Sequence, residues 1–437
     1  MAETHRVLVV GAGPAGLAAA FRAAESGLRV TVVDDNPAAG GQIWRGGEAK
    51  LESREAQAWF ERIRSGGDIQ LINGARVFHE PRAGTLLAET PSGVCELNYE
   101  KLILATGARE RFLPFPGWTL PNVIGAGGLQ ALVKTGLPIE GKRVVVAGSG
   151  PLLLAVAAYL RSRGADVLLI AEQAPSSRLI RFGAGLLLQK DKAGQVWRLR
   201  KELSRKDAKS QRRAPRYLSG CWVVGAQGEG KVESVVMVRG GRRWTVGCDY
   251  LACGFHLVPN VELAELLGCA VDNDSVRVNE FQETSVPNVY GAGEVTGIGG
   301  LELSLTEGEI AGLAAAGKHD AAREMFVVRD KQRRFARLLN QTFALRNELK
   351  QLAQPQTIVC RCEDITFERL RVHDSWRAAK LQTRCGMGPC QGRVCGSAVE
   401  FLFGWRAESV RPPVLPVRVE SLLATDYTDQ RRILADE

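Results

Sequence analysis

Three features of the sequence predict an α/β protein with two dinucleotide-binding (Rossmann-like) domains and a small helical domain at the C-terminal end. Residues 6–34 read as a strand, a glycine turn, a helix and a second strand that closes on an acid. Residues 143–172 repeat this order, and five of the ten cysteines lie between Cys360 and Cys395. Alternation of strands with helices is typical of parallel sheets covered by helices.

The composition is that of a globular protein. The chain has 437 residues, enough for two or three domains, with 45% hydrophobic and 24% charged residues. It contains no run of 18 or more apolar residues, so we expect no transmembrane segment. Met1 leads into the first strand without a signal-peptide pattern. We therefore expect a cytoplasmic location with reduced thiols.

The formal net charge of +9 is concentrated in one segment. Between Lys190 and Arg216 there are 11 Lys or Arg residues against 3 Asp or Glu residues. Such a run forms either a docking face for an acidic partner, lipid or nucleic acid, or a solvated helical excursion, and we favour the excursion. Few aromatic residues interleave with these charges, so we expect no nucleic-acid partner.

The first glycine turn has the pattern of a dinucleotide site. In GAGPAG, Gly11 permits the tight turn, Gly13 lets the backbone approach a pyrophosphate, and Gly16 lets the helix pack on the strand. Asp34, which ends the second strand, is placed to accept ribose hydroxyls. The predicted cofactor-binding residues of this region are Gly11, Gly13, Pro14, Ala15, Gly16, Asp34, Asp35, Gly41 and Gln42.

Two further strands end in glycine turns, LILATGARE with Thr106 and Gly107, and NVYGAGEVTG with Gly293 and Glu294. With these segments the chain resembles flavoproteins of the pyridine-nucleotide-disulfide-reductase type, which include thioredoxin reductase and ferredoxin reductases. The resemblance implies FAD. It also implies that Glu294, usually Asp in that family, holds the ribityl chain, and that a helix starting near Leu301 points its N-terminus at the flavin.

The second unit departs from the dinucleotide pattern. In the run that begins RVVVAGSG, Leu153 replaces the third glycine, and Ala171 stands where Asp34 stands in the first unit, with Glu172 one residue late. We expect a nucleotide-type domain that is degraded and does not bind NAD(P). The redox-active CxxC pair of the resembled family is missing from Cys95, Cys221, Cys248, Cys253 and Cys269, which we interpret as core residues.

The cysteines near the C-terminus read VCRCEDI and TRCGMGPCQGRVCG. A C-x-C pair followed by cysteines in a glycine-rich loop favours an iron–sulfur cluster. Glycine amides such as those of Gly386 and Gly396 are predicted to donate to the sulfurs. Zinc is the competing metal, although its structural sites usually use C-x2–4-C spacing. Disulfides are disfavoured in a reducing compartment.

This region resembles the [2Fe-2S] domain of bacterioferritin-associated ferredoxin, as appended to other flavoproteins. The resemblance implies Cys360, Cys362, Cys390 and Cys395 as metal ligands. Cys385 is an alternate ligand that either substitutes for Cys390 or stands free. The resulting division is an FAD-binding domain (1–115 and 259–320), a second nucleotide-type domain (116–258), a linker helix (321–355), the [2Fe-2S] domain (356–410) and a tail (411–437).

Over its full length the chain resembles the α-type subunit of heteromeric bacterial amine and amino-acid dehydrogenases, the group of D-hydroxyproline dehydrogenase, octopine and nopaline oxidases and hydrogen cyanide synthase. The resemblance implies an electron-transfer subunit with FAD and a [2Fe-2S] cluster and a partner FAD-containing β subunit that oxidises the amine. Peripheral membrane contact, FMN at a subunit junction and a small third subunit remain open. No catalytic residue is assigned, and the five histidines are scattered.

Two alternatives stand beside this hypothesis. One is a self-sufficient NAD(P)H-dependent reductase that passes electrons from flavin to cluster, against which Leu153 and Ala171 argue. The other is a non-catalytic scaffold that keeps a nucleotide and zinc for structure, which predicts a colourless protein.

Overall fold

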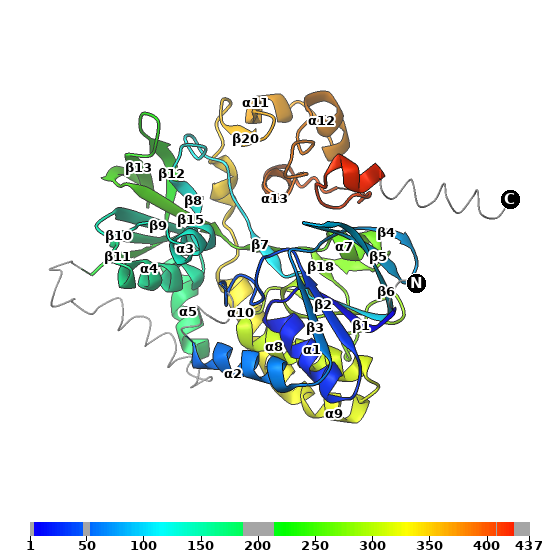
Figure 1. Ribbon diagram of the computed structural model, residues 1–437. Coiled ribbons are helices and arrows are strands. Elements are labelled where there is room, and N and C mark those ends of the chain that lie inside the picture. Colours follow the sequence, from blue (N-terminus) through cyan, green and yellow to red (C-terminus); the bar gives the residue numbers. More distant parts are fainter. Residues whose placement is uncertain (1–3, 47–52, 187–213, 408, 424–437) are drawn as a thin grey trace. The chain divides into compact units, whose positions relative to one another are not determined.

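A computed structural model describes residues 4–46, 53–186, 214–407 and 409–423 (Figure 1). All but the last three positions of the basic segment Lys190–Arg216 lie outside the described residues. The chain forms two compact units, each made of separate stretches of sequence. The first unit comprises Met1–Arg109, Pro259–Ala336 and Ser409–Glu437, and the second comprises Glu110–Val258 and Arg337–Glu408.

The first unit is built on a seven-stranded sheet with the order β3-β2-β1-β6-β5-β4, in which β19 also pairs with β6. Strands β1, β2, β3, β6 and β19 pair in parallel, and β4 and β5 join as an antiparallel hairpin. The bounds are β1 Thr4–Val10, β2 Val30–Asp34, β3 Ile69–Asn73, β4 Arg76–Arg82, β5 Thr85–Thr90, β6 Gly93–Leu104 and β19 Val289–Gly291. The predicted strands of this domain are confirmed.

Two helices distant in sequence pack at backbone distance in the first unit. They are α1 (Pro14–Glu25) and α8 (Leu301–Ala315). A Cβ atom on Gly308 or on Gly312 would lie 2.2 Å from the carbonyl oxygen of Ala15 or Ala19, so only glycine permits this approach. The same packing brings the loop at Gly293, whose Cβ would lie 2.7 Å from the Ala15 Cβ, to the start of α1.

The first unit is completed by short elements and by the end of the chain. These are α2 Arg54–Ser65, α7 Glu262–Leu266, β17 Val271–Asp272, β18 Ser275–Val276, η2 Gly293–Thr296 and α9 His319–Glu324. The amide of Val414 donates to the carbonyl of Phe78 at 2.9 Å, and Arg418 pairs with Glu89 at 3.2 Å. Part of the predicted tail therefore lies along the β4–β5 hairpin.

The second unit carries a parallel five-stranded sheet with the order β11-β10-β9-β15-β8. Its strands are β8 Val123–Gly125, β9 Arg143–Ser149, β10 Asp166–Glu172, β11 Arg216–Ser219 and β15 Tyr250–Phe255. Helices α3 (Ala126–Lys134), α4 (Leu152–Ser162) and α5 (Ser176–Leu186) accompany it. A separate antiparallel sheet contains β12 Cys221–Gln227, β13 Ser234–Arg239 and β14 Arg242–Gly247. The chain leaves the first unit within β7 (Ala108–Glu110) and returns within β16 (Leu257–Pro259).

The stretch predicted as one linker helix divides into several elements. It contains the end of α9, then α10 (Phe326–Thr342) and the 3₁₀ helix η3 (Asn347–Gln351). The cysteine-rich domain follows within the second unit, with β20 Ile358–Cys360, β21 Ile365–Thr366, α11 Phe367–Leu370, α12 Trp376–Thr383 and α13 Cys395–Phe403. Among the described residues, no helix is both long and apolar enough to span a bilayer.

Candidate functional site

The first glycine loop has the close backbone contacts that its sequence predicts. Gly11 has a φ of +108°, and a Cβ there would lie 2.2 Å from the carbonyl oxygen of Ala105. A Cβ on Gly16 would lie 1.8 Å from the Gly11 carbonyl oxygen. At Gly13, by contrast, the nearest atom to such a Cβ is 3.9 Å away. Gly11 and Gly16 are thus required by the fold, whereas at Gly13 a Cβ would make only an ordinary contact, with the Gly41 Cα.

The acid at the end of β2 shapes this loop. The Ala12 amide donates to Asp34 Oδ2 at 2.6 Å, and Oδ1 accepts from the backbone and side-chain amides of Asn36 at 2.8 and 2.7 Å. Asp35 is exposed and accepts a longer bond, 3.1 Å, from Asn36 Nδ2. Asp34 is thus engaged in holding the glycine turn, whereas its neighbour Asp35 is exposed to solvent.

The loop after β2 crosses the glycine turn. A Cβ on Gly41 would lie 3.0 Å from the Gly13 Cα, and the Gly40 amide donates to the Ala12 carbonyl at 2.8 Å. Gln42 is exposed, and its amide oxygen accepts from Arg45 at 2.6 Å. Gly41 therefore lies beside Gly13, and Gln42 follows it on the exposed side of the loop.

Thr106 and Gly107 lie just before the chain leaves the first unit, and both are hydrogen-bonded to Asn260. Thr106 Oγ1 donates to the Asn260 carbonyl at 2.7 Å, and the Asn260 side-chain amide donates to the Thr106 carbonyl at 2.9 Å. The Asn260 backbone amide donates to the Gly107 carbonyl at 3.0 Å. Arg109 donates to Asn260 Oδ1 at 2.7 Å and forms an ion pair with Glu262 at 2.9 Å. Asn260 was not among the predicted residues, because its role depends on a partner more than 150 positions away.

Glu294 has a buried carboxylate oxygen that tests the fit of the implied cofactor. Its Oε1 accepts from the Gly300 amide at 2.8 Å, while Oε2 is shielded from solvent and lacks a hydrogen-bond partner among the described residues. Burial raises the pKa of Glu294 to about 7. A buried polar atom normally has a partner, so a donor such as a sugar hydroxyl would satisfy Oε2. This orphaned oxygen fits the ribityl contact that the resemblance implies.

A buried ionic network fixes the loop that carries Glu294. The carboxylate of Glu307, on α8, is 2% exposed and accepts from the Gly293 amide at 3.2 Å and from Thr296 Oγ1 at 2.7 Å. Arg333, on α10, donates to its other oxygen at 2.7 Å and to Gln282 at 2.8 Å. Sequence reasoning missed this network. The available signal was that Glu307 shares a face of its helix with Leu303 and Ile310, where a glutamate is rarely buried unless it is paired.

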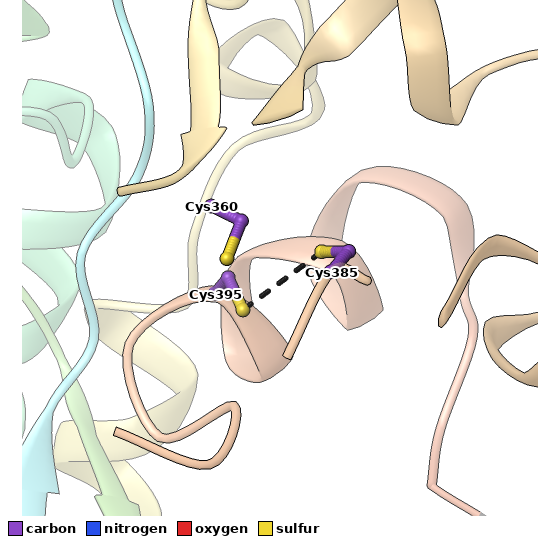
Figure 2. Close-up of side chains that lie close together, drawn as sticks. All are labelled: Cys360, Cys385 and Cys395. Atoms are coloured by element: carbon purple, nitrogen blue, oxygen red, sulfur yellow. Dashed lines mark hydrogen bonds between the residues drawn. The ribbon is translucent and has the colours of Figure 1, made fainter. Parts of the chain in front are cut away.

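Three cysteines gather in the core of the cysteine-rich domain (Figure 2). Cys360 ends β20, Cys395 begins α13, and Cys385 follows α12. Their sulfur atoms all lie within 4.8 Å of one another, and each side chain is at most 1% exposed. The thiol of Cys385 points at Cys395, with 3.9 Å between the sulfurs. Cys385, predicted as the alternate ligand, thus belongs to the buried trio.

Cys362 and Cys390 form a second group in the same domain. The Cys362 sulfur accepts hydrogen bonds from the backbone amide of Cys390 and interacts with its thiol. Cys362 is exposed and Cys390 half-buried. Cys360, Cys362, Cys390 and Cys395, the four predicted ligands, all line a cavity of about 280 Å³. The same cavity is lined by Phe112, Trp118, Val123, Ile124 and Gly125, which also belong to the second unit.

The surroundings of the trio favour a thiolate at Cys360. Hydrogen bonds from the thiols of Cys385 and Cys395, together with the backbone amides of Gly386 and Glu363, hold the pKa of Cys360 far below its usual range. The Gly386 amide is therefore a donor to sulfur, as expected. The Gly396 amide is not available, because it donates to the Gly392 carbonyl at 2.6 Å. Thiolates are the form that binds iron or zinc, so this cluster is compatible with an iron–sulfur centre.

The comparisons with known proteins agree with this geometry. A family model for pyridine nucleotide-disulphide oxidoreductases matches residues 5–180 and 216–319. This chain belongs to that family. Membership of the family implies an FAD-binding site, and the cradle around Gly13 with the orphaned Glu294 oxygen fits that cofactor. The chain is an oxidoreductase.

Several curated relatives match nearly the whole chain. The hydrogen cyanide synthase subunit HcnB of Pseudomonas aeruginosa is 30% identical over 89% of this chain and 90% of its own length. An opine oxidase subunit from Rhizobium meliloti is 29% identical over 98% of this chain and 88% of its own length. The predicted relationship to this group of oxidoreductase subunits is confirmed.

Solved structures confirm the predicted fold class. The L-proline dehydrogenase of P. horikoshii superposes with a TM-score of 0.67 at 16% identity, covering 96% of this chain and 79% of that chain. The thioredoxin reductase of T. acidophilum gives a TM-score of 0.54 at 21% identity and covers 72% of this chain and 98% of that chain.

Proposed function

We propose that this chain is the electron-transfer subunit of a heteromeric flavin-dependent amine or amino-acid dehydrogenase, whose substrate is an opine, D-hydroxyproline or a related compound. In this proposal, electrons pass between a partner's flavin and an acceptor through FAD and a [2Fe-2S] cluster of this chain. The observation that carries it is that five cysteines gather in one small domain of a chain that also has an FAD-type cradle.

The residues have distinct roles in this proposal. Bound FAD supplies two-electron exchange, and a bound [2Fe-2S] cluster supplies one-electron exchange. The cradle of Gly11, Gly13 and Gly16 would admit the pyrophosphate at the start of α1, and Glu294 Oε2 would accept from the ribityl chain. The remaining cofactor contacts would come from Pro14, Ala15, Asp34, Asp35, Gly41, Gln42, Thr106, Gly107 and Gly293.

The partner is inferred from the relatives. HcnB and the opine oxidase chain are both named as subunits, which supports a partner for this chain. We infer that the partner is an FAD-containing β subunit that oxidises the carbon–nitrogen bond. The complex would act in the cytoplasm.

The composition of the anaerobically purified protein tests the proposal. We expect one FAD per chain, two iron and two inorganic sulfide per chain, and a paramagnetic signal after reduction with dithionite. Zinc in place of iron, with no sulfide and no such signal, would contradict the relay. A substrate screen on the complex with its partner, using opines, D-hydroxyproline and an artificial electron acceptor, would then identify the amine.

Single cysteine-to-serine variants test the ligand set. We expect Cys360→Ser, Cys362→Ser, Cys390→Ser and Cys395→Ser each to lose most of the iron and sulfide. Cys385→Ser should keep both if that residue is not a ligand. Cys95→Ser is the control, because Cys95 lies in β6 of the first unit. Retention of the cluster in Cys390→Ser, together with its loss in Cys385→Ser, would instead make Cys385 the ligand.

A further inference from the structure

The second unit contains a glycine loop in the position where a dinucleotide pyrophosphate lies in nucleotide-binding sheets. The loop joins β9 to α4 and contains Gly148 and Gly150, both with positive φ. By analogy with the first loop, Gly150 is the position where the backbone would approach the phosphates. The structure shows what lies against this position instead.

The chain's own segment after α10, residues 343–346, covers the loop. Ser149 Oγ donates to the carbonyl of Phe343 at 2.6 Å, and Gln173 Nε2 donates to the same oxygen at 3.2 Å. The carbonyl of Ala344 accepts from Arg178 at 2.9 Å and from Gln173 Nε2 at 3.3 Å. The donors around the loop are thus directed at carbonyl oxygens of this segment.

The side chain of Phe343 fills the space above Gly150. Its Cγ lies 4.0 Å from the position that a Cβ on Gly150 would take, which is ordinary contact distance. The ring packs edge-on against Phe182 of α5, with 5.5 Å between the centroids, and Phe343 is 5% exposed. A pyrophosphate at Gly150 would need the volume that this ring takes.

A carboxylate takes the amide that a phosphate would use. Glu172 Oε2 accepts from the Gly150 amide at 2.7 Å, and Oε1 accepts from the Ala174 amide at 2.7 Å. Glu172 is 1% exposed. Phosphate sites at helix starts rely on free amides that point at the anion. An acid bound to that amide removes the donor and, when ionised, repels a phosphate.

We propose that residues 343–346 are a built-in occupant of the second nucleotide loop, which bars NADH and NADPH from it and ties the cysteine-rich domain to the nucleotide-type domain. Arg346 strengthens the attachment, because its backbone amide donates to Gln173 Oε1 at 3.3 Å and its guanidinium lies 4.8 Å from the Trp222 ring centroid. The inference does not depend on the FAD or the metal of the proposed function.

Nucleotide titration of the full-length wild-type protein is the first test. NADH and NADPH are added up to millimolar concentration while nicotinamide fluorescence and hydrogen exchange of residues 148–152 and 343–346 are measured. We expect no saturable fluorescence change and no change in exchange. Saturable binding that increases exchange at 343–346 would overturn the proposal, since the segment would then be displaceable.

Variants supply the second test. Phe343→Ala should increase hydrogen exchange at both 148–152 and 343–346 by at least about tenfold, because the two stretches protect each other. Phe326→Ala is the matched control at the other end of α10. Ser149→Ala is a milder variant, which should also increase hydrogen exchange at both stretches. Its control is Ser162→Ala, which removes an exposed hydroxyl on α4 that donates to the Tyr159 carbonyl. Unchanged exchange in both test variants would overturn the proposal.

Discussion

The two glycine loops, Gly11–Gly16 and Gly148–Leu153, share a backbone design and differ in what they leave free. In each, the first glycine has a positive φ and lies against a neighbouring strand: a Cβ would be 2.2 Å from the Ala105 oxygen in one and 1.9 Å from the Gly254 oxygen in the other. The first glycine therefore indicates a strand–turn–helix fold in both loops, and it does not by itself indicate that a ligand binds.

The difference appears at the later positions. Beside Gly13 the nearest atom to a Cβ would be the backbone Cα of Gly41 at 3.9 Å, whereas beside Gly150 it would be a ring carbon of Phe343 at 4.0 Å. The acids also differ, since Asp34 binds the amide of Ala12, one residue before Gly13, while Glu172 binds the Gly150 amide itself. A fully buried Leu153 stands in place of Gly16. The same fold can thus keep or lose a nucleotide site through a few contacts above the turn.

The largest expected effect follows from the third position of each loop. Gly16→Ala places a Cβ 1.8 Å from a backbone oxygen, so we expect destabilisation of about 3 kcal/mol or more together with loss of the flavin. Leu153→Ala should also cost about 3 kcal/mol by leaving a cavity, yet should retain the flavin. Urea unfolding and the visible absorbance of the purified variants measure both. Flavin loss in Leu153→Ala would remove the contrast between the loops.

The next effect concerns pH. Burial raises the pKa of Glu172 from 4.5 to about 7, so the folded protein binds this proton more tightly than the unfolded chain. Stability should fall as the pH rises from about 4.5 to about 7, and the full loss of about 3 kcal/mol should persist above that range.

Unfolding curves at about pH 5 and about pH 8 test this expectation. Glu172→Gln should remove the contribution of this residue, while the wild type and the exposed control Glu229→Gln keep the larger fall. Equal pH dependence in all three proteins would show that Glu172 does not carry a buried proton.

A smaller effect separates folding from binding in the first loop. In Gly13→Ala the nearest neighbour of the new Cβ is 3.9 Å away, so stability should stay within about 0.5 kcal/mol of the wild type. Flavin retention after gel filtration should nevertheless fall several-fold, because the methyl group takes space needed by the pyrophosphate. Full retention would mean that the cofactor does not approach this glycine.

The last effect concerns a single hydroxyl in the second loop. Ser149→Ala removes the hydrogen bond that Ser149 Oγ donates to the Phe343 carbonyl and the one that it accepts from Gln173 Nε2 at 2.9 Å. Gln173 Nε2 still donates to the Phe343 carbonyl. We expect a loss of about 1 kcal/mol in the free energy of unfolding. A loss above about 3 kcal/mol in chemical denaturation would show that the carbonyl is left unsatisfied and that Gln173 does not compensate.

Motifs whose parts are close in sequence were predictable. The strands around Gly11, the turn itself, the acid at Asp34 and the helix from Leu301 are all found where the sequence placed them. So is the gathering of cysteines from two short segments. Each of these follows from local sterics or from spacing. A turn with a positive φ requires glycine, and cysteines only a few residues apart in sequence stay close in space.

Contacts between residues far apart in sequence were decided by the tertiary structure alone. Asn260 at Thr106 and Phe343 at Gly150 leave no pattern in their own neighbourhoods, and the sequence around Glu307 does not identify Arg333 as its partner. The same is true of the neighbours of Cys360, since the sequence favoured Cys390 with Cys385 as the alternate, whereas the buried trio contains Cys385. Spacing determines which groups are within reach of each other along the chain, but packing determines which of them meet and which space they close.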